Sequence, residues 1–384
     1  MSPPLTPGTE AELAEAIATA AASATRLRIT GGATRAALGQ AIETDATLST
    51  TGLTGIELYE PGSLNIVVRA GTPLAEVTAA LEAENQQLAF EPMDHRALLG
   101  STGTPTVGAM VAAAISGPRR ILVGACRDHL LGVRFVNGRG EMLKNGGRVM
   151  KNVTGLDLAK LMCGAYGTLG VLSEVSLKTL PRAETACTLA FENLTPAQAT
   201  ALFCKALGTP YEISGAAYSG GTAYLRLEGF EVQVSNRSTR LQALFAAHES
   251  TVIEGAAHGA LWPSIRDARA LSAHTGSLWR LSVKPTDAAR IVTRLQDTLQ
   301  AEAALDWGGA LIWLAVPEFH TDPATRIRDT LAEYGGHAML VKGETTLRRA
   351  TAVFQPQAPA LAKITAGLRA RFDPHNILNP GLMG

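Results

Sequence analysis

The chain has 384 residues, and its 34 Lys and Arg residues balance its 34 Asp and Glu residues. A chain of this length holds about two domains. The formal net charge is +0 and no basic run is present, so the sequence predicts no nucleic-acid partner. No apolar run approaches the roughly 18 residues that cross a bilayer. Because residues 1–9 are polar and rich in proline, we expect no secretory signal and a cytoplasmic protein.

The cysteine pattern disfavours a metal or cluster site. The four cysteines are Cys126, Cys163, Cys187 and Cys204, and no two of them form a C-x-x-C pair. Zinc and iron–sulfur sites need a tight set of thiolates. We therefore expect no metal in this chain and mostly buried, apolar cysteine side chains.

The first half of the chain alternates short strands with glycine clusters. Thr9 and Glu12 form the pattern of a helix capping box, and Thr72-Pro73 indicates a second helix start, with Thr72 as its cap. Asn137-Gly138 between apolar runs predicts a hairpin. Strands are expected at residues 26–30, 55–59, 65–70, 131–136, 141–144 and 171–177.

After Pro181 the glycine clusters thin out and helical patterns alternate with strand patterns. Helices are expected at 196–207, 238–248, 287–300 and 323–334, and strands at 223–227, 278–283 and 311–316. This order is that of one β-α-β-β-α-β sandwich of about 160 residues, and no internal repeat is apparent. A last helix begins near Ala358.

Two glycine clusters have the composition of a phosphate-binding loop. Gly31-Gly32-Ala33-Thr34-Arg35 follows a strand, and its glycines let backbone amides approach an anion closely. A plain strand–turn connection explains the same residues equally well. The second cluster spans residues 100–108. In it, Thr106 is placed to cap a helix that carries Gly108, Ala112 and Ala113. Such small residues admit either a flat ligand or a closely packed neighbouring helix.

A third cluster, Gly164-Ala-Tyr-Gly167-Thr-Leu-Gly170-Val171, precedes a strand. The dinucleotide fingerprint G-x-G-x-x-G follows a strand instead, and that fingerprint is absent here, as is the P-loop pattern G-x-x-x-x-G-K-[ST]. A nucleotide site in this chain therefore needs another architecture.

Four segments and the C-terminus together resemble a known family. LRITGGATRAALG (27–39), GTPTVGAMVAAAISGPRR (103–120), the stretch 127–157 and GAYGTLGVLSEVSLKTLP (164–181) are similar to flavoproteins of the vanillyl-alcohol-oxidase type, also called PCMH-type. Residues 372–381, FDPHNILNPG, resemble the ending of its 2-hydroxy-acid dehydrogenase branch. Within the family the chain is most similar to the FAD-binding subunits of bacterial glycolate oxidases.

The resemblance implies an α+β fold in which a PCMH-type FAD-binding domain of two subdomains (1–181) precedes a smaller α/β cap domain (182–345). A C-terminal segment (346–384) returns to the FAD domain. It also implies non-covalent FAD, since the first loop has no histidine. The residues implied to bind FAD are Gly31, Gly32, Ala33, Thr34, Arg35, Pro105, Thr106, Val107, Gly108, Ser116, Gly117, Gly170, Val171 and, near the flavin ring, Asn379 with Gly381.

The chain also departs from the family pattern. Ala33 stands where relatives often have a third glycine, and its methyl group is tolerated there if φ is negative. Leu156 stands where many relatives have tyrosine. The isolated His95 and His129 are expected to be structural. Arg119 and Arg120 are expected either to contact a phosphate or a partner subunit, or to be paired within the chain.

Three functions follow from the resemblance. Catalytic relatives carry a His-x-Gly-Asp-Gly-Asn-x-His stretch in the cap, and residues 182–345 have none, so no catalytic residue is identified. The first hypothesis is therefore an FAD subunit that relays electrons in a multi-subunit glycolate oxidase. Its partners would be a larger flavin subunit that oxidises the small 2-hydroxy acid and an iron–sulfur subunit, and any membrane contact would be indirect. The alternatives are an autonomous FAD-dependent 2-hydroxy-acid dehydrogenase and a scaffolding subunit without flavin.

Overall fold

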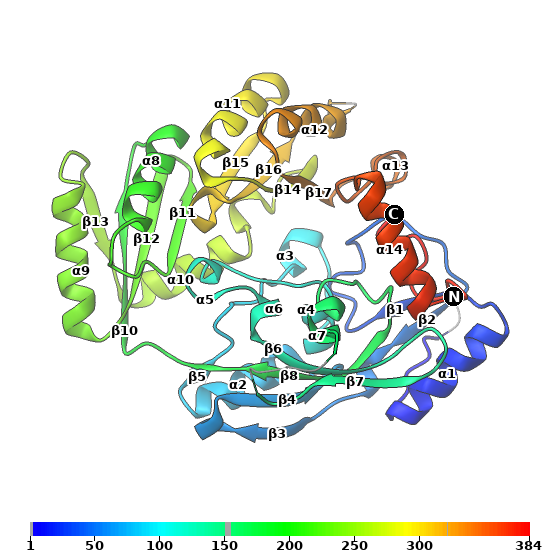
Figure 1. Cartoon of the computed structure of the whole chain (residues 1–384). Helices are drawn as coiled ribbons and strands as arrows, with labels where there is room; N and C mark the ends of the chain where they lie inside the picture. The colour runs from blue at the N-terminus through cyan, green and yellow to red at the C-terminus, as the bar shows by residue number, and fades with distance from the viewer. Residues whose placement is uncertain (1–2, 150–154, 321) are drawn as a thin grey trace.

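The computed structural model describes residues 3–149, 155–320 and 322–384. Figure 1 shows two β-rich halves, one built from the first part of the chain and the other from the green to orange part, with the C-terminal helix at the side. The fold is α+β, as the sequence predicts.

The N-terminal half contains a five-stranded antiparallel sheet in the order β3-β4-β8-β6-β7. Helix α4 packs against β4 and β8, and α7 against β6. The strands are β3 (Ile56–Glu60), β4 (Asn65–Arg69), β6 (Leu130–Val136), β7 (Met142–Gly146) and β8 (Val171–Lys178). The helices of this part are α2 (Leu74–Ala83), α3 (Arg96–Leu99), α4 (Val107–Ala112), α5 (Arg120–Val123), α6 (Cys126–His129) and α7 (Leu158–Met162).

A smaller unit joins the two ends of the chain. Strands β1 (Leu27–Thr30) and β2 (Ala46–Ser49) form a parallel pair, and α1 (Glu10–Ala22) packs on them through Leu13 and Ile17. After α13 (Thr345–Ala350) and α14 (Pro359–Phe372), Leu378 pairs with Leu27 in parallel. The C-terminal residues thus return to the N-terminal half of the molecule.

The second half is one eight-stranded antiparallel sheet, in the order β13-β10-β12-β11-β15-β16-β14-β17. It contains two β-α-β-β-α-β units joined edge to edge by β11 and β15, so the expectation of a single unit without internal repetition is wrong. The first unit comprises β10 (Thr185–Phe191), α8 (Pro196–Leu207), β11 (Gly215–Ser219), β12 (Thr222–Gly229), α9 (Glu231–Leu244) and β13 (Ser250–Ile253). After α10 (Gly255–Arg266), the second comprises β14 (Ser277–Ser282), α11 (Ala288–Leu299), β15 (Glu302–Asp306), β16 (Leu311–Val316), α12 (Pro323–Tyr334) and β17 (His337–Lys342).

The two faces of this sheet are buried differently. On one face Leu281, Ile312 and Leu314 pack with the buried stripes of the helices. On the other face Trp313 and Val341 belong to a core that also contains residues of the N-terminal half. The sheets divide the chain near residues 182 and 345, and the exact domain boundaries 1–181, 182–345 and 346–384 stay a prediction.

Local signals mark only some of the helix starts. The Thr9 hydroxyl accepts a hydrogen bond from the Glu12 amide, but the Glu12 carboxylate accepts from Gly8 rather than from Thr9. The expected cap at Thr72 is wrong, because α2 begins at Leu74 and the Thr72 hydroxyl accepts from the Gly55 amide instead. The Asn137 hairpin is confirmed by the pairing of β6 with β7.

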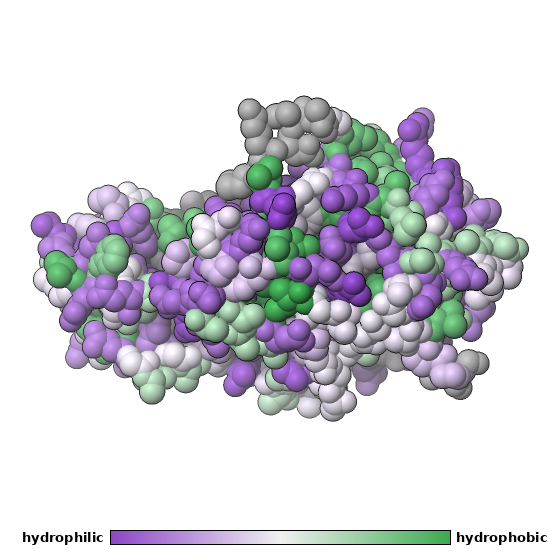
Figure 2. Space-filling model, turned by 90° about the horizontal axis from the view of Figure 1, so that it is seen from below, coloured by the Kyte–Doolittle hydropathy of each residue, from purple (hydrophilic) through white to green (hydrophobic). Residues whose placement is uncertain are grey.

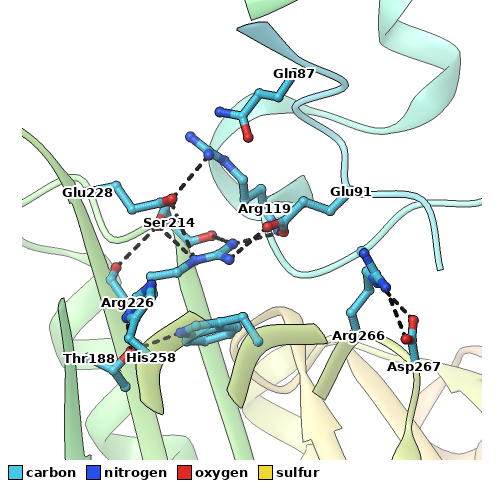
Figure 3. Close-up of polar contacts among 12 residues, drawn as sticks. Gln87, Glu91, Arg119, Thr188, Ser214, Arg226, Glu228, His258, Arg266 and Asp267 are labelled. Carbon is cyan, nitrogen blue, oxygen red and sulfur yellow. Dashed lines mark hydrogen bonds and ion pairs between the residues drawn. The ribbon is translucent and has the colours of Figure 1, made fainter. Parts of the chain in front are cut away.

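A cluster of ion pairs links the two halves (Figure 3). Arg226 on β12 donates to both carboxylate oxygens of Glu91, at 2.7 and 2.8 Å. Arg119 donates to Glu228 at 3.1 Å, and its own backbone amide donates to Glu91. Arg226 also lies over the Trp262 ring, 4.3 Å from its centre. Since Glu91 and Arg119 belong to the N-terminal half and Arg226 and Glu228 to the cap sheet, these pairs fix how the halves meet.

Hydrophilic and hydrophobic residues are interspersed on the face shown in Figure 2. Within the described ranges, no helix combines the length and the apolar character that crossing a membrane requires.

Candidate functional site

A cleft of about 770 Å³, counted with the space at its mouth, lies where four distant segments meet. Its wall includes the loop after β1, helix α4, the turn before β8 and the C-terminal residues. All three glycine clusters of the sequence therefore contribute residues to one cleft.

 The residues on its wall are Arg28, Ile29, Thr30, Gly31, Ala33, Thr34, Arg35, Ala36, Leu38, Thr50, Gly108, Ala109, Ala112, Ala113, Tyr166, Gly167, Gly170, Val171, Leu172, Asn379 and Leu382.

The loop after β1, residues 31–35, packs closely against residues 104–106. A β-carbon at Gly31 would collide with the Thr106 hydroxyl, and one at Gly32 would collide with the Thr104 carbonyl. Only glycine permits this close approach. Ala33 has a φ of 60°, so the negative φ under which a methyl group is easily tolerated there is not found, and this alanine is in the left-handed region that favours glycine.

The cleft is positively charged. Arg28 and Arg35 lie on its wall, and no aspartate or glutamate among the described residues does. Burial lowers the pKa of Arg35 to about 10, with Asp94 acting in the opposite direction, so this guanidinium stays charged at neutral pH. Arg35 donates to the Met93 carbonyl at 3.0 Å and to Nδ1 of His95 at 3.3 Å. Such a wall attracts an anionic ligand.

Two polar atoms beside the cleft are buried without a hydrogen-bond partner among the described residues: Nη1 of Arg35 and Oγ1 of Thr106. Thr106 precedes α4, as expected, but its side chain does not cap the helix. A buried polar group without a partner is costly, and a ligand rich in acceptor oxygens would satisfy a donor of either kind. The residues present therefore suit a diphosphate such as that of FAD.

The structure brings together most residues implied by the resemblance, and their role toward FAD stays a prediction. Gly31, Ala33, Thr34, Arg35, Gly108, Gly170, Val171 and Asn379 lie on the wall of the cleft. Gly32, Pro105, Thr106 and Val107 are not on that wall. The Pro105 carbonyl accepts from the Leu74 amide, and the Val107 amide donates to the Thr72 carbonyl.

Asn379 closes the C-terminal side of the cleft. Its side-chain oxygen accepts from the Ile29 amide at 2.9 Å, and its nitrogen donates to the Tyr166 carbonyl at 2.8 Å. Both polar ends of the side chain are thus occupied by backbone groups. Asn379 holds β1 and the Tyr166 turn together, and Gly381 is absent from the wall of the cleft.

Ser116 and Gly117 lie on a second pocket, of about 540 Å³, between the N-terminal half and the cap sheet. Leu38, Ala113 and Tyr166 border both spaces, so the two are neighbours. Sequence reasoning missed Tyr166 and the cap residues of this pocket. The Tyr166 position stands inside the third glycine cluster, which was the available signal, whereas Arg280 and Trp313 are far from any motif.

The remaining polar candidates are engaged inside the chain. Arg119 pairs with Glu228, and Arg120 lies over the Trp307 ring at 4.4 Å. His95 and His129 are both buried; burial and then Arg35 lower the pKa of His95 to about 3, so its ring is neutral. Across the described ranges, no group of three His, Cys, Asp or Glu side chains is placed to hold a metal ion.

Comparison with known proteins agrees with this arrangement. Residues 4–146 match the family described as FAD binding domain. The chain is 36% identical over 372 residues to the glycolate oxidase subunit GlcE of Escherichia coli, covering 97% of this chain and 96% of that protein. It is 31% identical over 140 residues to the glycolate oxidase subunit GlcD of Bacillus subtilis, 36% of this chain and 28% of that protein.

Among solved structures, the 4-ethylphenol oxidase from Gulosibacter chungangensis superimposes with a TM-score of 0.72 at 13% identity, over 98% of this chain and 88% of that one. This likeness shows the fold alone, which is that of the PCMH-type flavoproteins. The extent of the match to the Escherichia coli protein decides the family: the chain belongs to the family of the glycolate oxidase subunit GlcE, and its N-terminal part is an FAD binding domain.

Proposed function

We propose that this chain binds one FAD non-covalently in the cleft and serves as the FAD-binding subunit of a multi-subunit glycolate oxidase. The observation that carries the proposal is the cationic cleft itself, in which loops from four parts of the chain meet around Arg28 and Arg35 with no carboxylate among the described wall residues. The names of its relatives, glycolate oxidase subunits GlcE and GlcD, support the wider complex.

Each wall residue has a distinct part in this proposal. The backbone of residues 31–35 and the Arg35 guanidinium would hold the diphosphate, with Gly108 allowing close approach from α4. Gly170 and Val171 would border the adenosine end, and Asn379 would keep the Tyr166 turn in position. The alanines Ala109, Ala112 and Ala113 leave room for a flat ligand along α4. When bound, FAD supplies a ring that accepts two electrons from a substrate and passes them to an acceptor.

The partners proposed are a larger flavin subunit, which oxidises the small 2-hydroxy acid, and an iron–sulfur subunit. We propose a cytoplasmic location, with any membrane contact made through these partners. The described residues contain no cluster of thiolates for an iron–sulfur centre, so the onward electron path would lie in another chain.

The test separates the subunit role from an autonomous dehydrogenase. The purified chain is mixed with glycolate under anaerobic conditions, with and without the larger flavin subunit, while the flavin absorbance near 450 nm is followed. The subunit role predicts no loss with the chain alone and, with the larger subunit present, a loss greater than that subunit's own flavin can account for. Rapid loss with the chain alone would establish the autonomous dehydrogenase instead.

A further inference from the structure

Helix α14 (Pro359–Phe372) lies at the outside of the molecule, and none of its 14 residues is buried (Figure 1). Residues 356–364, which lead into the helix and form its first turns, are all exposed. Its C-terminal end is anchored, because the Phe372 ring lies 6.2 Å from the Phe135 ring. Helices in proteins gain most of their stability by packing an apolar face. The first half of α14 has no face buried against the described residues.

This helix carries bulky apolar side chains along one side. Leu361, Ile364 and Leu368 follow one another at spacings of three and four residues, which places them on the same face of the helix. Leu361 is 51% exposed and Ile364 is 61% exposed. A single exposed leucine is ordinary, but neighbouring apolar side chains on a helix without a buried residue form a surface suited to a partner.

The same part of the chain is basic. Residues 345–372 contain no acidic residue. They contain five basic residues: Arg348, Arg349, Lys363, Arg369 and Arg371. Two of them, Arg348 and Arg369, donate hydrogen bonds to backbone carbonyls. The other three are exposed and form no ion pair with a described residue. In a chain whose formal net charge is +0, this local excess of positive charge attracts an acidic surface.

A basic helix with an apolar side can dock on a protein or on a membrane. Helices that lie in the membrane interface carry a wide apolar face with bulky residues such as tryptophan and phenylalanine. Residues 359–371 contain neither of these, and apart from Leu361, Ile364 and Leu368 their apolar side chains are those of alanine and one proline. This narrow apolar side flanked by small residues favours the groove of a protein over a lipid surface.

We propose that α14 docks into an acidic, partly apolar groove of the larger flavin subunit. The inference rests on the proposed function for the presence of that subunit. The position of the helix supports this occupant, because α14 leads directly to Asn379 and Leu382, which lie on the wall of the flavin cleft. A subunit seated on α14 therefore lies beside the cleft, where a subunit that passes electrons to the bound FAD needs to be.

The test measures binding of the purified larger flavin subunit to the immobilised, FAD-treated chain by surface plasmon resonance. Leu361→Gln combined with Ile364→Gln removes the bulky apolar side chains and introduces a residue that favours helix. We expect this double variant to bind about 10- to 100-fold more weakly, as truncation of central interface residues does. The matched control is Val232→Gln on α9, where the valine is 82% exposed, and it should leave binding unchanged.

A second double variant, Lys363→Glu with Arg371→Glu, reverses two of the exposed charges. We expect binding about 10-fold weaker at about 0.1 M salt and a smaller effect at about 1 M salt, because salt screens exposed charges. Arg240→Glu, at an exposed residue of α9, is the control for charge reversal and should bind like the wild type. Circular dichroism and flavin content are measured on every variant, and both should be unchanged.

Equal binding of the larger flavin subunit by the wild type and both α14 variants would overturn the inference and leave the proposed function standing. So would binding of α14 to vesicles of anionic phospholipid, or to the iron–sulfur subunit, in place of the larger flavin subunit. A wild-type chain that binds FAD but not the larger subunit would refute both the inference and the proposed complex. A chain that binds this subunit through α14 but takes up no FAD would refute only the FAD-binding part of the proposed function.

Discussion

At the scale of single residues, the cleft is built from groups whose local preferences are not met. Ala33 has a left-handed backbone conformation, and Arg35 and Thr106 each bury a polar atom without a partner among the described residues. Sequences tend to break local rules of this kind at functional sites. The positions of these residues are consistent with a ligand that compensates for them.

Replacing Ala33 with glycine should stabilise the chain. The left-handed conformation costs an alanine about 1–2 kcal/mol, and the greater freedom of glycine in the unfolded chain offsets part of the gain. We expect the free energy of unfolding in urea to rise by about 0.5–1 kcal/mol. Ala79→Gly, in the exposed middle of α2, should lower it by about 1 kcal/mol. A fall at position 33 as large as that at position 79 would contradict the account.

Asp306 should make stability depend on pH. Burial raises its pKa in the folded chain from 3.8 to about 7, so folding favours the protonated form. Its contribution to stability is complete below the unfolded pKa and is lost as the pH rises through about 7. Asp306→Asn keeps an oxygen for the Trp307 amide without a charge.

We therefore expect the unfolding free energy of Asp306→Asn, relative to the wild type, to rise between pH 5 and pH 8 by on the order of 2 kcal/mol. Urea unfolding at both pH values measures this difference. A difference that does not change with pH would show that Asp306 is ionised throughout.

At the scale of elements, contacts between distant segments shape the site. Glu91 and Arg119 from the N-terminal half meet Arg226 and Glu228 on β12. Burial raises the pKa of Glu228, but Arg226 and Arg119 outweigh it, and the pKa is lowered overall. The carboxylate is therefore charged when the chain is folded.

Glu91→Gln should weaken the junction between the halves, since it removes one of the two carboxylates that pair with the buried Arg226 and leaves only Glu228. Breaking a buried ion pair typically costs about 3–5 kcal/mol, and the amide oxygen of glutamine retains part of it, so we expect a loss of about 2–4 kcal/mol in urea unfolding. Glu82→Gln, which breaks an exposed pair with Arg182, should cost less than about 1 kcal/mol. Equal losses of unfolding free energy at both positions would mean that the buried ion pairs stabilise the chain no more than an exposed pair does.

Asn379→Ala should loosen the cleft, because β1 and the Tyr166 turn both bond to this side chain. We expect a loss of about 1–3 kcal/mol in stability and faster release of FAD, followed by the fluorescence of freed flavin. Thr6→Ala, in an exposed hydrogen bond near the N-terminus, is the control. Unchanged flavin release in Asn379→Ala would remove this residue from the proposed site.

At the scale of the whole molecule, the sequence predicted the elements better than their assembly. Local periodicity and capping residues gave helices such as Pro196–Leu207 and Pro323–Tyr334 with the bounds seen in the structure. The duplication of the β-α-β-β-α-β unit went unrecognised although Gly220-Gly221 and Gly308-Gly309 mark the turns after β11 and β15. A turn signal places a hairpin, but it does not say which strands pair across the sheet. The pairing of β11 with β15 depends on contacts far apart in the chain.

The candidate site, too, could be predicted from the sequence only in part. Glycine clusters mark the loops because close backbone approach restricts residue type at Gly31 and Gly32. Nothing local marks the cap residues Arg280 and Trp313, which reach the wall of the second pocket only when the two halves pack together. Pairing and burial are properties of the folded chain, and a single sequence does not contain them directly.

The central claim is that the cleft around residues 31–35 holds one FAD, and the stoichiometry of FAD binding tests it most directly. FAD is titrated into the purified chain, and bound flavin is counted by absorbance after gel filtration. The account predicts one FAD per chain for the wild type and a clearly lower occupancy for Arg35→Met. A wild-type chain that stays colourless with excess FAD would contradict it.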